Sequence, residues 1–407
     1  MTTLTQNSIP IHLPISKSIS NRVLVLEFLA QQNFSLENVS DANDSQLMIK
    51  CLNRIKSTQD GVIDCEDAGT VFRFLTSVLS ITQGDWILTG TERMKERPIN
   101  TLVNALRSMG AEIIYLNNEG FPPIQLRGKR LEGGSVIISN SKSSQFISSL
   151  MMIAPFLDKG LTINVDLNNQ DSAPYIKMTA DIMRNLGIKV SLSDSNISIP
   201  PSKTIPPKHF SIENDWSAAS YFYSIVATQP HLTLFLDKLY ANSIQGDSIV
   251  SKLFEQLGVK TMFTDDGILI SNTGNTVSSF NEDFRNCPDL AQTFAVCCAV
   301  LKIPATLSGL SSLKIKETDR LNALFVELTK MGGNVRVEND TLYISPSDYS
   351  PNSIETYSDH RMAMAFAPLE LLYPNVIINN KQVVRKSFPN FWNEFEKVKH
   401  FINNKAR

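Results

Sequence analysis

The chain has 407 residues, 42% of them hydrophobic and 19% charged, and its formal net charge at pH 7 is −2. This length allows two domains, and the charge balance argues against a nucleic-acid-binding protein, which normally carries a basic excess. Residues 1–13 lack the charged-then-apolar pattern of a signal peptide, and no apolar run is long enough to span a bilayer, so we expect a cytoplasmic protein that does not bind membranes.

Six short helical segments with little charge recur along the chain, each opening on small, polar or cationic residues. They begin near Ser18, Gly69, Ser144, Ser217, Asp289 and Asp359. The last four contain no Asp, Glu, Lys or Arg over 144–157, 217–228, 290–301 and 362–369. A helix without a polar face is normally buried on all sides. We therefore predict interior helices.

A second signal keeps the same period: an amphipathic helix that ends in glycine and is followed by a β-type run. The glycines are Gly110, Gly187, Gly258 and Gly332, and the runs that follow them cover 111–115, 188–190, 259–263 and 334–337. Glycine is the residue expected just after a helix end. Two looser copies lie at 47–56 and 391–404. The pattern predicts six repeated units, each with a buried helix, a surface helix and strands.

Six units divide naturally into three plus three, which predicts two similar domains of an α/β protein. The proline-rich stretch 200–207, near the middle of the chain, is the expected boundary between the two domains. If the strand before Ser16 pairs with the later half, the chain crosses between the domains twice.

Neither cysteines nor histidines point to a metal site or a disulfide framework. Cys51, Cys65, Cys287, Cys297 and Cys298 form no CxxC pair, so we expect buried packing thiols. The five histidines are scattered and predict no metal cluster.

Basic residues stand repeatedly at predicted helix starts, where the helix dipole disfavours them by a few tenths to about 1 kcal/mol each unless an anion lies opposite. They are Lys17, Arg22, Arg73, Lys316, Arg320, His360 and Arg361. Together with the hydroxyl and amide clusters 16–18 and 143–145, they favour sites for phosphate or carboxylate groups. Simpler readings stay open: Ser18, Ser143 and Asp289 as helix caps, and Arg320 in a pair with Glu317 or Asp319.

Nine short sequence motifs are distributed along almost the whole chain. They are LPISKSISNR (13–22), DAGT (67–70), RMKERPI (93–99), SSQF (143–146), PYI (174–176), PD (288–289), KETDR (316–320), DHRMAM (359–364) and KSFP (386–389). The set resembles the enolpyruvyl transferase family of 5-enolpyruvylshikimate-3-phosphate (EPSP) synthases. The resemblance implies two domains of three βαβαββ units, over 16–213 and over 1–15 plus 214–407, with helix N-termini directed into an interdomain cleft.

The resemblance also implies an activity: joining phosphoenolpyruvate to the 5-hydroxyl of shikimate 3-phosphate, with release of phosphate, in the pathway to chorismate and the aromatic amino acids. The family acts without a metal or organic cofactor, and we expect a monomer whose partners are these two small molecules.

Site residues carry over from the resemblance position by position. The implied shikimate 3-phosphate set is Lys17, Ser18, Arg22, Ser143, Ser144, Gln145, Ser172, Tyr175, Asp289, Ser312 and Lys316. The implied phosphoenolpyruvate set is Lys17, Gly69, Arg97, Gln145, Arg320, Arg361 and Lys386. The implied catalytic groups are Asp289 as the base that deprotonates the hydroxyl, Glu317 as the proton donor to the methylene carbon, and Lys17, which shares the proton transfer.

A few positions depart from the family pattern. Ile15 and Glu66 stand where glycine is usual, Asp67 and Ser312 where asparagine is usual, and Phe74 where proline is common. These departures bear on affinity and on the response to inhibitors that resemble phosphoenolpyruvate, and they leave the implied catalytic residues in place.

Two other functions remain open at this point. The first is the sister enzyme that transfers enolpyruvyl to UDP-N-acetylglucosamine. It usually carries a cysteine on a loop near the position of Arg97, whereas no cysteine lies between Cys65 and Cys287 here. The second is an inactive relative that binds an anionic metabolite; such a protein gains nothing from the acids Asp289 and Glu317.

Overall fold

The computed structural model describes residues 8–32, 34–138, 143–202 and 204–405 and has a mixed α/β fold. The chain divides into two compact units. Unit 1 comprises the chain up to Ser16, the short segment Asp41–Asn43 and the chain from Glu213 onward; unit 2 comprises Lys17–Ser40 and Asp44–Ile212. In the described part of the chain, no helix is long and apolar enough to cross a membrane.

Unit 2 contains two four-stranded sheets, with strand orders β3-β4-β6-β5 and β7-β8-β10-β9, and the parallel pair β2-β11. Its strands are β2 (Ser35–Glu37), β3 (Asp60–Asp64), β4 (Gly84–Thr89), β5 (Glu112–Tyr115), β6 (Ile124–Gly128), β7 (Gly134–Ile137), β8 (Leu161–Asn164), β9 (Ser191–Leu192), β10 (Asn196–Ile199) and β11 (His209–Ser211). Its helices are α1 (Lys17–Ala30), α2 (Asn43–Ser57), α3 (Gly69–Ile81), α4 (Glu92–Lys95), α5 (Asn100–Ser108), α6 (Ser144–Ile153) and α7 (Ala173–Asn185).

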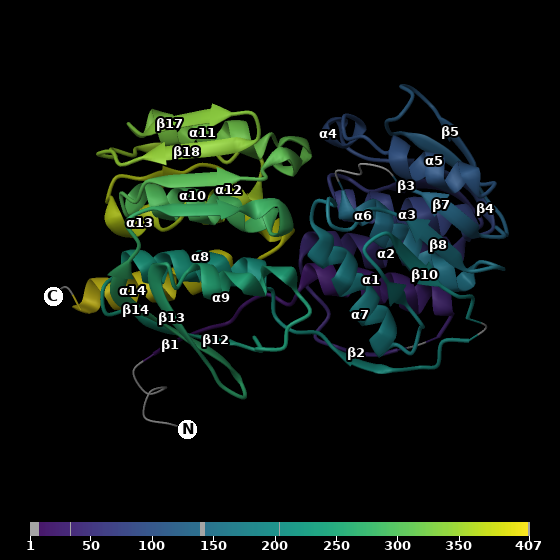
Figure 1. Ribbon diagram of the computed structural model, residues 1–407, viewed down its shortest axis with the longest axis horizontal. Helices are drawn as coiled ribbons and strands as arrows, with labels where there is room; N and C mark the ends of the chain where they lie inside the picture. Colours follow the sequence, from purple (N-terminus) through teal and green to yellow (C-terminus); the bar gives the residue numbers. More distant parts are fainter. Residues whose placement is uncertain (1–7, 33, 139–142, 203, 406–407) are drawn as a thin grey trace. The chain divides into compact units, whose positions relative to one another are not determined.

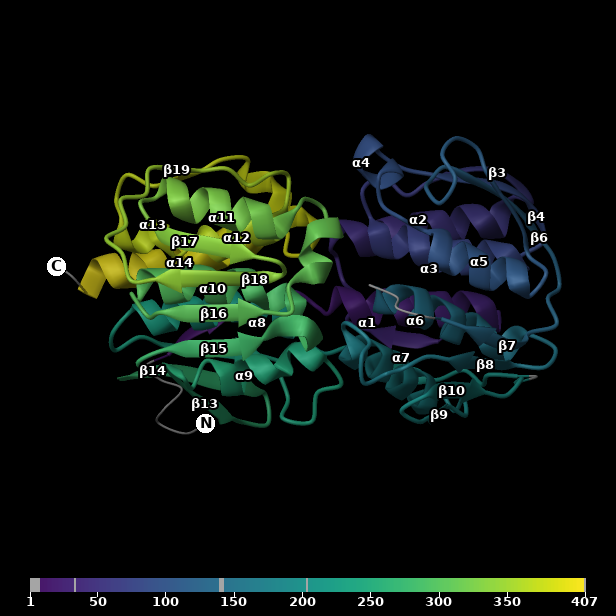
Figure 2. The same ribbon diagram turned by 45° about the horizontal axis from the view of Figure 1, so that its top comes forward.

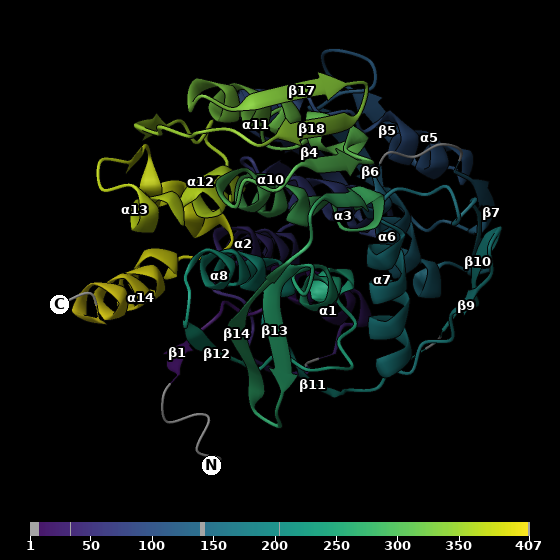
Figure 3. The ribbon, with the colours of Figure 1, turned by 60° about the vertical axis from the view of Figure 1, so that its left-hand side comes forward.

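Unit 1 has the same inventory of sheets: β1-β12-β14-β13, β15-β16-β18-β17 and the parallel pair β19-β20. Its strands are β1 (Ile9–Ile11), β12 (Thr233–Asp237), β13 (Leu257–Phe263), β14 (Gly267–Thr276), β15 (Phe280–Asp283), β16 (Ala305–Ser308), β17 (Asn334–Glu338), β18 (Thr341–Ser345), β19 (Ser353–Ile354) and β20 (Ile377–Ile378). Its helices are α8 (Trp216–Thr228), α9 (Val250–Leu253), α10 (Ala291–Val300), α11 (Arg320–Lys330), α12 (His360–Phe366), α13 (Leu369–Leu372) and α14 (Phe391–Lys405). Figure 3 shows β13 and β14 side by side as a long hairpin.

The four-stranded sheets share one connectivity. We number the four strands of each sheet by their order along the chain. The first strand is parallel to the second, the second is antiparallel to the fourth, and the fourth is antiparallel to the third. Parallel neighbours need a long crossover between them, whereas antiparallel ones can be joined by a short turn. The strand β1 pairs with β12, more than two hundred residues later, so the pairing of the first strand with the later half is confirmed.

Each unit is built around three helices that pack on one another. These are α1, α3 and α6 in unit 2, and α8, α10 and α12 in unit 1. Figure 1 shows α8, α10 and α12 between the sheet with β17 and β18 and the sheet with β12 and β13, and Figure 2 shows α1, α3 and α6 inside unit 2. Every described side chain of α12 is buried, and only the last residue of α8 and of α10 is not. The predicted interior helices are confirmed.

Two of these helices end earlier than predicted, both beside a proline. The segment 144–157 forms α6 and then a short 3₁₀ helix, η2 (Ala154–Phe156), which contains Pro155. The segment 362–369 is interrupted by Pro368, which lies between α12 and α13. Proline has no N–H to donate and its ring displaces the preceding turn, so an all-apolar run does not guarantee one continuous helix.

The predicted glycine stops have the expected left-handed backbone. The φ angles of Gly110, Gly187 and Gly332 are +94°, +85° and +97°, and these residues follow α5, α7 and α11. Two details were wrong: the run after Gly187 does not pair until β9, and Gly258 lies inside β13 rather than before it. All five cysteines are free and buried, as expected of packing thiols.

The proline-rich stretch does not mark the division between the units. The described residues of 200–207 lie within unit 2, before β11, and the division follows Ile212. The chain passes between the units near Ser16 and again near Glu213, and these two segments are hydrogen-bonded to each other. Ser16 N donates to Glu213 O at 3.0 Å, and Ile15 forms an antiparallel bridge with Asn214.

Candidate functional site

In unit 2, the predicted site residues gather at the starts of the three central helices. Arg22 lies in the second turn of α1 and is 2% exposed. Its Nε donates to Thr179 Oγ1 at 2.7 Å, its Nη1 to Ser18 O at 2.8 Å and its Nη2 to Ser148 Oγ at 3.3 Å. All three acceptors are neutral oxygens, and burial lowers the pKa of Arg22 to about 10. A buried cation held only by neutral groups favours the binding of an anion.

The start of α3 brings two more guanidinium groups together. Arg73 and Arg97 are 5% and 6% exposed, and the Nη1 atom of each lies 2.6 Å from the point that a Cβ on Gly69 would occupy. In the described residues, Nε of Arg97 has no hydrogen-bond partner and Arg97 forms no ion pair. Two guanidinium groups repel each other and the positive end of the helix, and an anion bound between them would offset this repulsion. Because Gly69 has no side chain, both guanidinium groups can lie close to the start of α3.

Replacing Gly69 with alanine tests this site. The new Cβ would displace the two guanidinium groups, which are flexible ends of long side chains. If Gly69 lines the phosphoenolpyruvate site that the resemblance implies, the variant should fold and its KM for phosphoenolpyruvate should rise about tenfold or more, equivalent to about 1.4 kcal/mol. Steady-state kinetics measure the change. The matched control is Gly187→Ala: Gly187 has φ +85° and open space around it, so that change strains the backbone without touching an arginine. An equal rise in KM for both variants would contradict the assignment of Gly69.

The start of α6 is joined to the start of α3 through Gln145. Its Oε1 accepts from Arg73 Nη1 at 2.8 Å, and its Nε2 donates to Thr70 Oγ1 at 2.9 Å. Ser143 occupies the N-cap position of α6, but its side chain makes no capping hydrogen bond, so the simple capping reading of Ser143 is wrong. Ser144 follows it and is buried.

The remaining predicted residues of unit 2 lie on α1 and α7. Lys17 Nζ donates to Asp44 Oδ2 at 2.9 Å, an ion pair whose side chains are 13% and 4% exposed. Ser172, at the N-cap of α7, is buried and has a left-handed backbone with φ 60°. Its carbonyl accepts from the N–H of Tyr175 at 3.0 Å. Sequence reasoning missed Asp44, which nothing near Lys17 in the sequence indicates.

In unit 1, the predicted residues form a network around Arg320, the first residue of α11. Arg320 is 1% exposed. Its guanidinium binds Asp359 in bidentate fashion, at 2.6 and 3.3 Å, and also donates to Asp289 Oδ1 at 3.0 Å and to Glu317 Oε2 at 2.8 Å. The ion pair of Arg320 with Glu317 is therefore confirmed, but Glu317 is only one of three carboxylates that Arg320 binds. The carboxylates raise the pKa of Arg320 against the lowering effect of its burial.

Asp289 lies in the 3₁₀ turn η5 (Pro288–Leu290), directly before α10. Arg361 Nη2 donates to its Oδ2 at 2.8 Å, and Lys316 Nζ lies 3.7 Å from its Oδ1. Burial would raise the pKa of Asp289, but Arg361, Lys316 and Arg320 outweigh it and hold that pKa far below its usual range. Burial also lowers the pKa of the Lys316 ammonium. Asp289 is thus an ionised carboxylate among three cations.

The acids and cations of this network are equal in number. The acids are Asp289, Glu317 and Asp359, and the cations are Lys316, Arg320 and Arg361. Lys386, at the end of the 3₁₀ helix η7 (Lys381–Lys386), and Ser312, in η6 (Ser311–Ile315), are also buried. An anion that binds here must compete with carboxylates for the arginines, whereas the arginines of unit 2 are held mainly by neutral groups.

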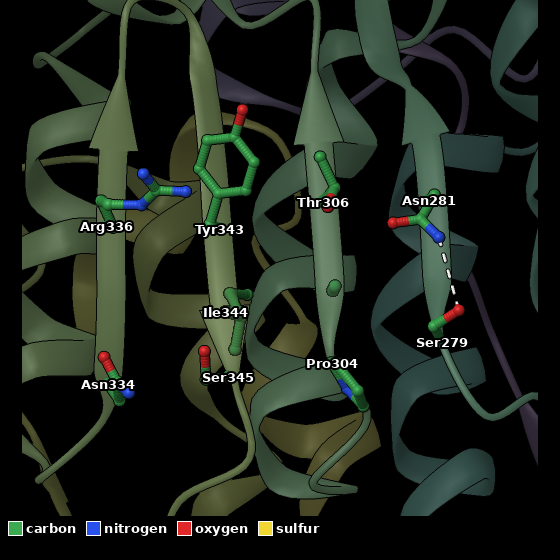
Figure 4. Close-up of a pocket in the computed structure, with 10 residues that line it drawn as sticks. Ser279, Asn281, Pro304, Thr306, Asn334, Arg336, Tyr343, Ile344 and Ser345 are labelled. Atoms are coloured by element: carbon green, nitrogen blue, oxygen red, sulfur yellow. Dashed lines mark hydrogen bonds between the residues drawn. The ribbon is translucent and has the colours of Figure 1, made fainter.

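A polar depression on the sheet β15-β16-β18-β17 is separate from these residues. Figure 4 shows Asn281, Thr306, Tyr343 and Arg336 projecting from neighbouring strands. The guanidinium carbon of Arg336 lies 4.4 Å from the centroid of the Tyr343 ring. None of the predicted site residues lines it. The depression is therefore distinct from the predicted site residues of either unit.

The comparisons with known proteins agree with these features. The family model described as "EPSP synthase (3-phosphoshikimate 1-carboxyvinyltransferase)" matches residues 5–395. A 3-phosphoshikimate 1-carboxyvinyltransferase from Bacteroides fragilis is 45% identical over 396 residues, which cover 95% of this chain and 94% of the relative. One from Haemophilus influenzae is 35% identical over 419 aligned residues, covering 95% and 96%.

A solved structure extends the likeness to the fold. The EPSP synthase from Acinetobacter baumannii superposes with a TM-score of 0.75 over 96% of each chain, at 18% identity. The sequence matches cover nearly the whole chain at identities that establish a family. The chain therefore belongs to the EPSP synthase (3-phosphoshikimate 1-carboxyvinyltransferase) family.

Proposed function

We propose that this protein transfers the enolpyruvyl group of phosphoenolpyruvate to the 5-hydroxyl of shikimate 3-phosphate and releases phosphate, as a step of the shikimate pathway to chorismate and the aromatic amino acids. The observation that carries the proposal is the family match over residues 5–395. The acid and cation network around Arg320 supplies groups suited to this chemistry. UDP-N-acetylglucosamine as the acceptor and an inactive binding protein are the outcomes to be excluded.

We propose an architecture of two domains with three βαβαββ units each, over 16–213 and over 1–15 plus 214–407; residues 1–7 lie outside the described residues. Helix N-termini would face a cleft between the domains. The shared connectivity of the four-stranded sheets and the three mutually packed helices of each unit support the repeat. A monomer in the cytoplasm remains part of the prediction.

Shikimate 3-phosphate would bind chiefly through unit 2. Its proposed contacts are Lys17, Ser18, Arg22, Ser143, Ser144, Gln145, Ser172, Tyr175, Asp289, Ser312 and Lys316. Arg22 supports this assignment most directly, because its buried charge is met by neutral oxygens. A phosphate dianion near it would supply the missing counter-charge, and hydroxyl donors such as Ser144 suit phosphate oxygens.

Phosphoenolpyruvate carries a carboxylate and a phosphate and so requires several cations. Its proposed contacts are Lys17, Gly69, Arg97, Gln145, Arg320, Arg361 and Lys386. Planar guanidinium groups bind such oxygens in pairs. Arg320 and Arg361 are bound to Asp289, so the substrate oxygens would take over part of this pairing.

The proposed chemistry is an addition followed by an elimination. Glu317 gives a proton to the methylene carbon of phosphoenolpyruvate, which makes the adjacent carbon cation-like, while Asp289 takes the proton of the attacking hydroxyl. The new C–O bond gives a tetrahedral adduct. Loss of the methyl proton re-forms the double bond as phosphate leaves with the C–O bonding electrons. Lys17 shares the proton transfer, and no covalent enzyme intermediate, metal or organic cofactor is invoked.

While Asp289 is paired with Arg361 and Arg320, its low pKa makes it a weak base. When Arg361 and Arg320 turn part of their charge to the anions of phosphoenolpyruvate, their lowering effect on Asp289 falls and its pKa rises toward the range of a useful base. Binding of phosphoenolpyruvate would thereby make Asp289 a stronger base.

Phosphate release tests the proposed function. We expect release from phosphoenolpyruvate only when shikimate 3-phosphate is added, and no release with UDP-N-acetylglucosamine. Release with UDP-N-acetylglucosamine alone would assign the sister activity. Binding of both shikimate-pathway ligands without release would identify an inactive binding protein, and either result would overturn the proposal.

A further inference from the structure

Asp247 is a buried carboxyl that the proposed mechanism does not use. It lies in the 3₁₀ helix η3 (Gly246–Ile249) of unit 1 and is 2% exposed. Ser217, in the first turn of α8, donates its hydroxyl to Asp247 Oδ2. An aspartate is almost never fully buried unless it is paired, and the hydroxyl of Ser217 is a neutral partner.

The loop that carries Asp247 is fixed in place by Gln245. Its Oε1 accepts from Ser16 Oγ at 3.1 Å and from Trp216 N at 3.2 Å, and its Nε2 donates to Asn214 O at 2.7 Å. These hydrogen bonds are buried. The side-chain amide of Gln245, two residues before Asp247, is hydrogen-bonded through both its oxygen and its nitrogen. These bonds fix the loop and keep the Asp247 carboxyl away from solvent.

The charged and titratable groups that act electrostatically on Asp247 lie on three other elements. They are Asp215, the N-cap of α8; Cys287 and Asp289, before and within η5; and Arg361, on α12. Arg361 is already bound to Asp289 Oδ2 at 2.8 Å and donates to Tyr221 OH at 3.2 Å. Ser217, which binds Asp247, and Tyr221, which binds Arg361, lie one turn apart on α8. Asp247 is therefore a second acid near the Asp289–Arg361 pair.

Burial raises the pKa of Asp247 to about 7, and the negative charge of Asp289 adds to the rise, against the opposite effects of Ser217 and Arg361. The carboxyl is therefore neutral at mildly acidic pH and ionised at alkaline pH. When it is ionised, a second negative charge acts on Arg361 and opposes the approach of an anionic ligand.

We propose that Asp247 is a positioning residue that sets the charge beside the Asp289–Arg361 pair and thereby makes the affinity for phosphoenolpyruvate depend on pH. The inference rests on the proposed function, in which Arg361 binds phosphoenolpyruvate. It assigns Asp247 no contact with substrate: the residue acts through the charge available on Arg361.

The test compares the KM for phosphoenolpyruvate of the full chain and of its Asp247→Asn variant at about pH 6 and about pH 8.5, on either side of neutrality. At the lower pH the two values should agree within about twofold, because Asp247 is neutral. At the higher pH the variant should have a KM about fivefold lower or more. The titration of the substrate phosphate affects both proteins equally and cancels in the ratio.

A second variant keeps the test decisive if asparagine is poorly tolerated. Ser217→Ala removes the hydroxyl that stabilises the carboxylate, so the rise in KM should move to higher pH. The matched control is Glu394→Gln, a buried acid that instead accepts from His12 N and Lys397 Nζ; its pH dependence should equal that of the unchanged protein.

The outcomes separate the two proposals. If the enzyme turns over and the KM ratio between the chain and Asp247→Asn is the same at both pH values, the role of Asp247 is refuted while the proposed function stands. If no turnover occurs with shikimate 3-phosphate at either pH, the proposed function itself fails. Thermal melts add an independent readout: the stability of Asp247→Asn relative to the unchanged protein should rise between about pH 4 and about pH 7 and level off above that, because in this range Asp247 is ionised in the unfolded chain and neutral in the folded one.

Discussion

Replacing Asp289 with asparagine is expected to lower kcat by about a hundredfold or more, without raising the KM for phosphoenolpyruvate. Asparagine keeps the shape of the side chain but cannot accept the proton of the attacking hydroxyl. It also removes the negative charge that holds Arg361 at 2.8 Å and Arg320 at 3.0 Å. The two arginines are then more available to an anionic substrate, so binding should be retained or become tighter.

Steady-state kinetics with both substrates varied give kcat and KM separately, and the split between them is the informative result. A rise in KM with kcat unchanged would mean that Asp289 serves binding alone. The matched control is Asp340→Asn, because Asp340 pairs with Lys314 at 2.7 Å and is 45% exposed. This control should leave both constants unchanged.

Replacing Arg320 with methionine is expected to abolish turnover and to lower the free energy of unfolding by about 3–5 kcal/mol. The Arg320 side chain is 2% exposed, and its guanidinium binds the carboxylates of Asp289, Glu317 and Asp359. Methionine fills a similar volume but leaves these buried acids without their shared cation. Breaking a buried pair in this way is far more damaging than losing an exposed one.

Urea denaturation measures the loss of stability. Arg130→Met is the matched control: Arg130 pairs with Asp158 but is 83% exposed, so its replacement should leave the stability nearly unchanged. Adding Asp359→Asn to Arg320→Met removes one stranded charge and should restore part of the stability. A loss as small as that of the control, or no gain from the second change, would contradict the charge balance described for this network.

Much of the fold follows from local sequence signals. An all-apolar segment such as that of α8 has no face suited to water, so its burial could be predicted without a structure. Glycine after a helix, as at Gly110 and Gly332, marks the stop because the chain there adopts a positive φ. The exact helix ends were less predictable, since Pro155 and Pro368 interrupt apolar runs that continue past them.

The site was predictable in its cations and not in their partners. Lysines and arginines at helix starts stand out because the helix dipole disfavours them there. Their partners come from distant parts of the chain: Arg22 meets Thr179, 157 residues away, and Arg320 meets Asp359, 39 residues away. No local pattern encodes these distances. Asp247 was missed for the same reason.

The departures from the family pattern have different structural consequences. Glu66 has a φ of 49°, a backbone that disfavours residues other than glycine by about 1 kcal/mol, which accounts for the usual glycine at this position. Phe74 is buried and its ring lies 5.3 Å from the Arg22 guanidinium, so it supports an arginine of the proposed shikimate 3-phosphate site. Asp67 is exposed.

The central claim is that a hydroxyl of shikimate 3-phosphate displaces phosphate from phosphoenolpyruvate on this protein. Phosphorus NMR of a mixture of both substrates with the enzyme tests it directly. We predict that inorganic phosphate and a new phosphate monoester appear together, in equal amounts, as both substrate signals decline. Phosphate formed while the shikimate 3-phosphate signal stays constant, or no change in either signal, would contradict the account.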